Sequence, residues 1–277
     1  MSGRGARRRL AFLIEYDGAG FGGSQIQKTA PSIQAELETA LHKLTGERLR
    51  VAFAGRTDAG VHALGQVAAC TTGSSLATGV FVRGLNAWLP PQIAVRRALE
   101  VDESFDPRRD ASGRTYRYTV YNAAVRSPLW RDRAWHVGEP LDVAAMQEAA
   151  ALLEGEHDFA AFSRREPATT VRCVRRCRVE REGPLVTIEV EANAFLRQQV
   201  RRTAGALVRA GRGELTPAAI RALLRKAVPA SAGPVAPACG LCLLRVSYAG
   251  LDLGPETRYD DARAGASPSR RRRASRR

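Results

Sequence analysis

The stretch GRTDAGVHA at residues 55–63 decides how the rest of the sequence is interpreted. It follows a short apolar run, and glycines stand on both sides of the charged residues Arg56 and Asp58. Glycine permits a sharp turn, which would present the Asp58 side chain outward from the end of a strand. From local chemistry alone, a turn or cap role for Asp58 and a structural role for His62 are the more frequent ones.

The sequence around this stretch alternates between strand-like and helix-like segments. In the N-terminal part we expect strands at 10–16, 49–54, 66–71 and 93–99, and helices at 32–45 and 80–88. In the C-terminal part we expect strands at 116–121, 173–182, 185–191 and 241–248, and helices at 143–153, 195–210 and 217–227. Ser32 is placed to cap the first helix and Gly46 to end it. The pattern predicts an α+β fold with mostly antiparallel sheets flanked by helices.

The same pattern suggests how the chain divides. We expect an N-terminal α+β half at 9–107, which carries the Asp58 loop, and a C-terminal α+β half at 108–250. The two ends, 1–8 and 251–277, are basic and rich in Gly, Ser and Ala, without an apolar periodicity that could be buried. This composition predicts disordered tails.

The chain is strongly basic, with a formal net charge of +15. Four arginines near the N-terminus and six near the C-terminus supply ten of these charges, so a smaller excess remains on the folded part. That excess is carried almost wholly by arginine, whose guanidinium can bind two phosphate oxygens at once. The charge favours a nucleic-acid partner; an arginine-biased composition without such a partner is the alternative that charge alone leaves open.

The cysteines and the hydropathy of the chain indicate a cytoplasmic protein. Five scattered cysteines do not form the pattern of a secreted disulfide framework. The first apolar run, 10–14, is too short for a signal sequence, and no stretch approaches a membrane span. Cys239 and Cys242 form a CxxC that could join Cys173 and Cys177 at a structural zinc, but their strand-like surroundings favour buried thiols. We therefore expect no metal.

The stretch at 55–63 resembles, residue for residue, the active-site motif of the tRNA pseudouridine synthase A (TruA) family. Further matching segments follow in the family's order and approximate spacing, namely IEYDG at 14–18, GQV at 65–67, YRY at 116–118, NAFL at 193–196 and VR at 200–201. The resemblance covers about residues 9–249. It departs from the family at Ser24, where many members have tryptophan before the glutamine, and at FDPR (105–108), in place of the usual Phe-x-Ala-Arg.

The resemblance implies a pseudouridine synthase fold, with two ferredoxin- or RRM-like halves, and a set of site residues. Asp58 would be the essential catalytic carboxylate, and Arg201, from a late helix, would pair with it and keep it charged. Tyr116 would take part in catalysis and pack against the target base, and Arg56 would help to hold the target nucleotide outside its stem. Without the resemblance, a core role for Tyr116 and an exposed helical position for Arg201 are the ordinary expectations.

The activity that the resemblance implies is isomerisation of uridine to pseudouridine in the tRNA anticodon stem-loop, at tRNA positions 38, 39 and 40, by a symmetric homodimer. Uracil leaves C1′ of the ribose, rotates and rejoins through C5, so substrate and product are isomers and no cofactor is required. Asp58 could act as nucleophile or take a proton from the sugar, and the sequence leaves both routes open.

Two rival functions belong to other classes. A noncatalytic RNA-binding protein with the same fold would suit the positive charge equally well, but it would not need Asp58, Arg201 and Tyr116 together. A base methyltransferase would need a nucleotide-binding loop that opens a helix after an early strand, and the glycine-rich segment at 18–23 leads into no helix at once. Motifs of dinucleotide-binding folds, Walker loops and HExxH metalloproteases are also missing from the sequence.

Overall fold

The structure is a computed structural model that describes residues 7–164 and 169–254. Its strands are β1 (Arg8–Tyr16), β2 (Ala52–Phe53), β3 (His62–Thr72), β4 (Ile93–Val101), β5 (Ala111–Asn122), β6 (Trp135–Val137), β7 (Gly155–Asp158), β8 (Val171–Glu182), β9 (Leu185–Ala192) and β10 (Leu241–Tyr248). Its α-helices are α1 (Ile33–Thr45), α2 (Thr78–Trp88), α3 (Val143–Ala151), α4 (Gln199–Gly211) and α5 (Pro217–Lys226). Short 3₁₀ helices are η1 (Pro128–Trp130), η2 (Ala160–Phe162) and η3 (Ala238–Gly240).

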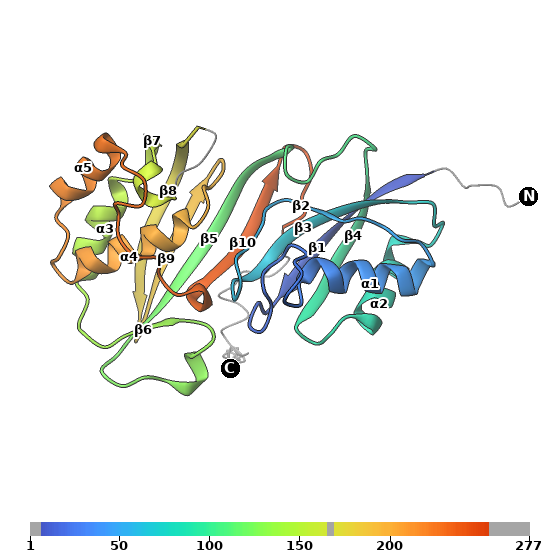
Figure 1. Cartoon of the computed structure of the whole chain (residues 1–277), viewed down its shortest axis with the longest axis horizontal. Helices are drawn as coiled ribbons and strands as arrows, with labels where there is room; N and C mark the ends of the chain where they lie inside the picture. Colours follow the sequence, from blue (N-terminus) through green and yellow to red (C-terminus); the bar gives the residue numbers. More distant parts are fainter. Residues whose placement is uncertain (1–6, 165–168, 255–277) are drawn as a thin grey trace, which may run out of the picture.

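The strands of the described ranges form one sheet in the order β4-β1-β3-β10-β5-β9-β8-β7, with β2 added to β3 and β6 added to β5. Most neighbours are antiparallel; the β10–β3 and β5–β6 pairs are parallel. Figure 1 shows α1 and α2 along the N-terminal strands and α3, α4 and α5 beside the C-terminal strands. The predicted α+β class, with mostly antiparallel strands and flanking helices, is confirmed.

The last strand, β10, joins the two parts of the sheet. It runs antiparallel to β5 over most of its length and meets β3 in a short parallel pairing of Cys242 with His62 and Leu243 with Ala63. A strand from the end of the chain therefore lies between the early strand β3 and the middle strand β5 (Figure 1). The division into halves at residue 107 stays a prediction. No helix in the described ranges is long and apolar enough to cross a membrane.

Helix α1 begins and ends where its sequence indicates. The buried Ser32 hydroxyl accepts a hydrogen bond from the Ala35 N–H at 3.2 Å, which satisfies one donor of the first turn. At the other end Gly46 has φ of +75°, and its N–H donates to the His42 carbonyl at 2.8 Å. A left-handed residue after the last turn is the role for which glycine is preferred.

Replacing Ser32 by alanine is expected to lower the free energy of unfolding by about 1 kcal/mol, because the Ala35 N–H loses its acceptor at a buried helix start. Urea unfolding followed by far-UV circular dichroism measures the change. Ser75→Ala is the matched control, since Ser75 is exposed in the segment before α2. Equal stabilities of the two variants would contradict the capping role of Ser32.

Several boundaries differ from the sequence-based expectation. The helix expected from Phe195 begins at Gln199 instead, because Gln198 adopts a left-handed conformation with φ of +62°. The strand expected at 49–54 is reduced to β2. The short strands β6 and β7 were not predicted, because β6 has only three residues and β7, with the sequence GEHD, has no apolar residue in alternation. Arg8, placed in the expected N-terminal tail, begins β1. Most of both expected tails, 1–6 and 255–277, lies outside the described residues.

Candidate active site

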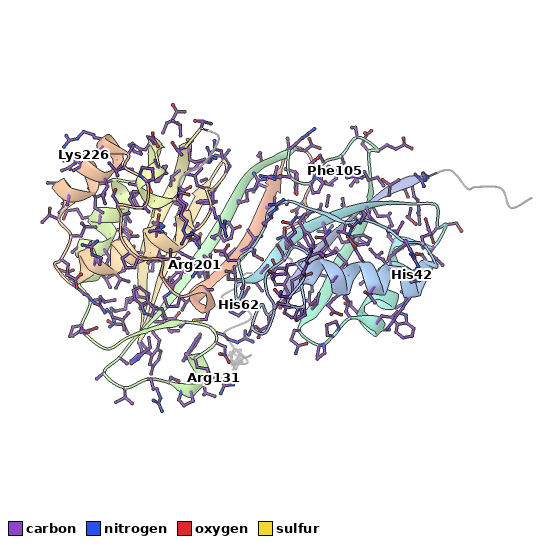
Figure 2. All side chains as sticks on the ribbon, viewed as in Figure 1. His42, His62, Phe105, Arg131, Arg201 and Lys226 are labelled. Carbon is purple, nitrogen blue, oxygen red and sulfur yellow. The ribbon has the colours of Figure 1, made fainter. Side chains whose placement is uncertain are left out.

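The order of the sheet brings the candidate residues together. The loop 54–61, which carries Asp58, leads directly into β3, and the first residue of β3 pairs with β10. On the next strand, Leu243 of β10 pairs with Tyr116 of β5. Helix α4, which carries Arg201, packs against β5. The labelled side chains Arg201 and His62 accordingly lie near the middle of the molecule, where the two parts of the sheet meet (Figure 2).

The loop turns sharply after Asp58, as its sequence predicts. The Val61 N–H donates to the Asp58 carbonyl at 3.2 Å and closes a four-residue turn. Gly60, the third residue of this turn, has φ of +77°, a conformation that side chains with a Cβ rarely adopt. The turn leaves the Asp58 side chain 32% exposed, so that a ligand can reach the carboxylate.

Asp58 and Arg201 form an ion pair. The distance from Arg201 Nη1 to Asp58 Oδ2 is 2.9 Å, and the Arg201 side chain is only 15% exposed. Arg201 Nε also donates to the Ala236 carbonyl at 2.8 Å. Two bonds in different directions fix the guanidinium, which complements the negative charge of the carboxylate. The pairing that the resemblance implies is therefore present in the structure.

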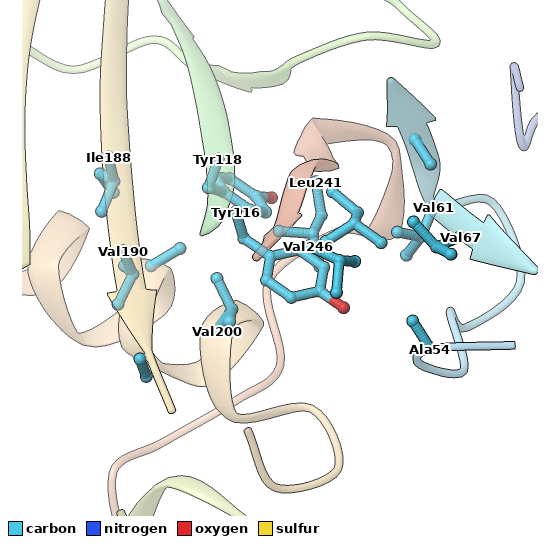
Figure 3. Packing of buried hydrophobic residues seen from close by; sticks show 14 of the residues in the cluster. Ala54, Val61, Val67, Tyr116, Tyr118, Ile188, Val190, Val200, Leu241 and Val246 are labelled. Carbon is cyan, nitrogen blue, oxygen red and sulfur yellow. The ribbon is translucent and has the colours of Figure 1, made fainter. Parts of the chain in front are cut away.

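Tyr116 lies beside this pair and is almost buried, with 9% of its surface exposed. Its ring meets that of Phe195 edge-on, with the centroids 5.2 Å apart. Figure 3 shows the ring reaching from β5 toward the Ala54 segment. Burial raises the pKa of the Tyr116 phenol above its ordinary value, and the charge of Asp58 contributes in the same direction. The hydroxyl is therefore protonated at neutral pH, and Tyr116 has both a core position and proximity to Asp58.

Arg56 occupies a different position from the other three residues. Its side chain is exposed, and no hydrogen bond joins it to Asp58, Arg201 or Tyr116 in the part of the chain that the structure describes. It stands two residues before Asp58 on the outer side of the same loop. The structure thus brings Asp58, Arg201 and Tyr116 together and leaves Arg56 at the solvent side.

A further arginine, Arg114 on β5, bonds to several segments around the site, and no sequence pattern marks it. Its guanidinium donates to the carbonyls of Ala54 at 3.0 Å, Asn193 at 2.9 Å, Arg108 at 2.8 Å and Ala111 at 3.3 Å. Burial lowers its pKa from the ordinary value. Arg114 therefore connects the start of the Asp58 loop with the loop that carries Phe195.

Replacing Arg114 by methionine is expected to lower the free energy of unfolding by about 2 kcal/mol, because four carbonyl groups lose a donor and the bonds to Ala54 and Ala111 are partly buried. Thermal unfolding followed by circular dichroism measures this loss. Arg83→Met removes an exposed guanidinium from α2 and should leave stability within about 0.5 kcal/mol of the parent. A loss no larger for Arg114→Met than for Arg83→Met would contradict the connecting role.

His62 and Ala63, at the end of the 55–63 stretch, line a pocket of about 350 Å³. Two ion pairs line it: Arg133 lies 3.1 Å from Asp17, and Arg96 lies 3.7 Å from Glu15. Asp58, Arg201 and Tyr116 do not line it. His62 Nδ1 also accepts from the Gly18 N–H at 3.1 Å, which supports a structural role for this histidine.

The cysteines do not assemble into a metal-binding group. Among the described residues, no three His, Cys, Asp or Glu side chains are placed to hold a metal ion. Cys177 and Cys242 are buried, and burial raises the pKa of each thiol to about 12. Both are therefore neutral thiols at physiological pH.

Comparison with known proteins agrees with the resemblance. The sequence matches the family model described as tRNA pseudouridine synthase over residues 13–110 and 149–249. It is 48% identical to the tRNA pseudouridine synthase A of Pelobacter propionicus over 243 residues, which are 87% of this chain and 100% of that protein. The protein of the same name from Geotalea uraniireducens is 46% identical, with the same coverage.

Among solved structures, the archaeal box H/ACA sRNP Nop10-Cbf5 complex is similar with a TM-score of 0.31 and 13% identity, covering 70% of this chain and 43% of that chain. This likeness is too remote to carry an argument about the site.

Proposed function

The chain belongs to the tRNA pseudouridine synthase family, and from that premise we propose that it converts uridine to pseudouridine in the tRNA anticodon stem-loop, with Asp58 as the catalytic carboxylate. It is an isomerase that acts on tRNA. The observation that carries the assignment of the site is the ion pair between Asp58, in the 55–63 stretch, and Arg201, which is 143 residues away in the sequence.

The reaction exchanges one glycosidic bond for another. The C1′–N1 bond breaks, the detached uracil rotates, C5 bonds to C1′, and the hydrogen on C5 leaves as a proton while N1 gains one. Every carbon, nitrogen and oxygen atom of the base is retained and one proton is lost while another is gained, so neither a redox carrier nor a group donor is consumed, and we propose that no cofactor takes part. The Asp58 carboxylate either attacks C1′ or takes a proton from the ribose; both routes need a charged carboxylate in a shielded place.

The remaining site residues have complementary tasks in this proposal. Arg201 holds the carboxylate in position and offsets its charge, so that the reacting oxygen need not be stabilised by water. Tyr116 supplies a flat, apolar surface against which the uracil ring can rest while it rotates, since stacking is insensitive to the orientation of a base. Its phenol is protonated, and its ring is kept in place by Phe195.

Arg56 suits the RNA backbone rather than the reacting atoms. Taking a uridine out of a stem costs a few kcal/mol of stacking and pairing, which phosphate contacts can offset. The exposed Arg56 guanidinium, on the same loop as Asp58, can bind the phosphate beside the extruded nucleotide. The target positions 38, 39 and 40 follow from the family resemblance.

The proposal also includes the assembly and its cellular place. A homodimer, as the resemblance implies, would present two copies of the Asp58 site to one tRNA. Sedimentation equilibrium should then give twice the chain mass of 30.0 kDa. We propose a cytoplasmic location, which a tRNA substrate favours.

The direct test uses tRNA with tritium at uridine C5, because this hydrogen is lost when C5 becomes the glycosidic carbon. The purified protein should release the label from tRNA, and release should fall when the uridines at positions 38 to 40 are replaced by cytidine. Label released equally from the replaced tRNA would move the target elsewhere in the molecule. A folded protein that binds tRNA and releases no label would instead favour the noncatalytic RNA-binding function.

A further inference from the structure

The residue before Asp58, Thr57, is held by groups from two distant parts of the chain. Its N–H donates to the Ser24 hydroxyl at 2.9 Å, and its carbonyl accepts from the Ser24 N–H at 3.1 Å. Its hydroxyl lies 2.8 Å from the Tyr16 hydroxyl. Thr57 is 7% exposed, Tyr16 is 3% exposed and Ser24 is fully buried. The backbone and the side chain of Thr57 are therefore both fixed from outside its own loop.

A second anchor holds the loop two residues before Thr57. The Gln66 amide Nε2 donates to the Gly55 carbonyl at 2.9 Å and to the Tyr16 hydroxyl at 3.3 Å. The Tyr16 and Thr57 hydroxyls share one hydrogen bond, in which either oxygen can be the donor. Burial raises the pKa of Tyr16 to about 12, so its phenol keeps its hydrogen throughout the neutral range.

The anchors belong to regular elements of the N-terminal part. Tyr16 is the last residue of β1, a strand paired on both sides, with β3 and β4, and Gln66 lies in β3. Ser24 is fixed to the start of α1, because its carbonyl accepts from the Gln34 N–H at 3.0 Å. The Gly23 backbone passes so close that an added Cβ would lie 2.7 Å from the Thr57 carbonyl oxygen.

The loop itself has little regular structure with which to hold Asp58. The loop 54–61 makes backbone hydrogen bonds from Ala54 to Val67, within the turn after Asp58, and with the segment at 21–24. A displacement of about 1 Å in a reacting group can cost about a hundredfold in rate. The position of the Asp58 carboxylate relative to Arg201 therefore depends on the bonds made by its neighbours, above all on those of Thr57.

We propose that Tyr16 is a positioning residue for the reaction: its hydroxyl, through the Thr57 hydroxyl, sets the place of the Asp58 carboxylate relative to Arg201 and the reacting ribose. This inference rests on the proposed function. It assigns to Tyr16 no contact with RNA, since the side chain is buried behind the loop. The effect of losing the hydroxyl should therefore fall on the chemical step and not on tRNA binding.

The test measures kcat, KM and tRNA affinity for Tyr16→Phe, Thr57→Val and the double variant by release of tritium from uridine C5. Each single variant should lower kcat about tenfold to a hundredfold, with KM and tRNA affinity within about twofold of the parent. The double variant should be no slower than the slower single variant, because both changes remove the same bond. Thr57→Ser, which keeps the hydroxyl, should stay close to the parental kcat.

The matched control is Tyr121→Phe, which removes the hydroxyl of a half-buried tyrosine on β5 whose ring faces His136. It should keep the parental kcat. Thermal unfolding of every variant separates loss of folded protein from loss of rate. If Tyr16→Phe does not fold, Thr57→Val tests the same hydrogen bond.

Three results would overturn the positioning role while leaving the proposed function intact. These are a parental kcat for Tyr16→Phe with lowered stability only, a raised KM with kcat unchanged, and effects of the two single variants that multiply in the double variant. A parent protein that releases no tritium is a different failure: it overturns the proposed function, and the positioning role with it, because Tyr16 then has no reaction to serve.

Discussion

Exchanging Asp58 for asparagine is expected to slow pseudouridine formation by about four orders of magnitude or more, while tRNA binding stays close to that of the parent. Asparagine has nearly the same shape as aspartate, and its amide oxygen can still accept a hydrogen bond from Arg201. It can neither attack C1′ as an oxygen nucleophile nor take a proton from the ribose. Whichever of the two routes operates, the chemical step should be lost.

Single-turnover release of tritium from uridine C5, with enzyme in excess over tRNA, measures this step without a contribution from product release. The matched control is Asp132→Asn, which removes an exposed carboxylate that bonds only to its neighbour Arg131 in the described structure. This control should react at the parental rate. An Asp58→Asn variant that binds tRNA and keeps more than about a tenth of the parental rate would remove Asp58 from the chemistry.

The parts of the fold that could be predicted from sequence are those set by local interactions. Helix α1 shows this, since Ser32 and Gly46 act within one turn of the residues that they cap. The start of α4 shows the opposite case. Its pattern predicts a helix from Phe195, but Gln198 turns left-handed and Leu196 N–H bonds to the Gln199 side chain, which leaves Phe195 in a loop facing Tyr116. No periodicity in the sequence reveals this turn or the contact of Phe195 with a residue of β5.

The residues of the site also fall into two groups: those that the sequence indicated and those that only the structure reveals. The 55–63 stretch marked Asp58 because its residues are contiguous, and the family resemblance supplied Arg201 from a distant helix. No local pattern could place β10 between β3 and β5, which is what brings the Asp58 loop beside Tyr116. Arg114, Tyr16 and Gln66 act through bonds to backbone carbonyls and hydroxyls of distant segments. Such bonds have no signature in spacing or composition, and only the folded chain reveals them.

Replacing Arg201 by glutamine is expected to lower kcat by about a hundredfold to a thousandfold, the second largest effect among these variants. Glutamine removes the charge that complements Asp58 and cannot span both the carboxylate and the Ala236 carbonyl, which Arg201 binds at 2.9 Å and 2.8 Å. Arg201→Lys keeps the charge but not the two-directional geometry, so its rate should lie between those of the parent and Arg201→Gln. Single-turnover tritium release measures all three.

Arg221→Gln provides the control, because it removes an exposed guanidinium from α5 and should leave the rate unchanged. In the Asp58→Asn background, Arg201→Gln should cause little further loss of rate, since the guanidinium no longer has a carboxylate to hold. A different combination of rate and tRNA affinity would assign another role to Arg201. If Arg201→Gln weakened tRNA binding but reacted at the parental rate with saturating tRNA, its guanidinium would serve the RNA backbone, and the ion pair with Asp58 would be a feature of the free protein alone.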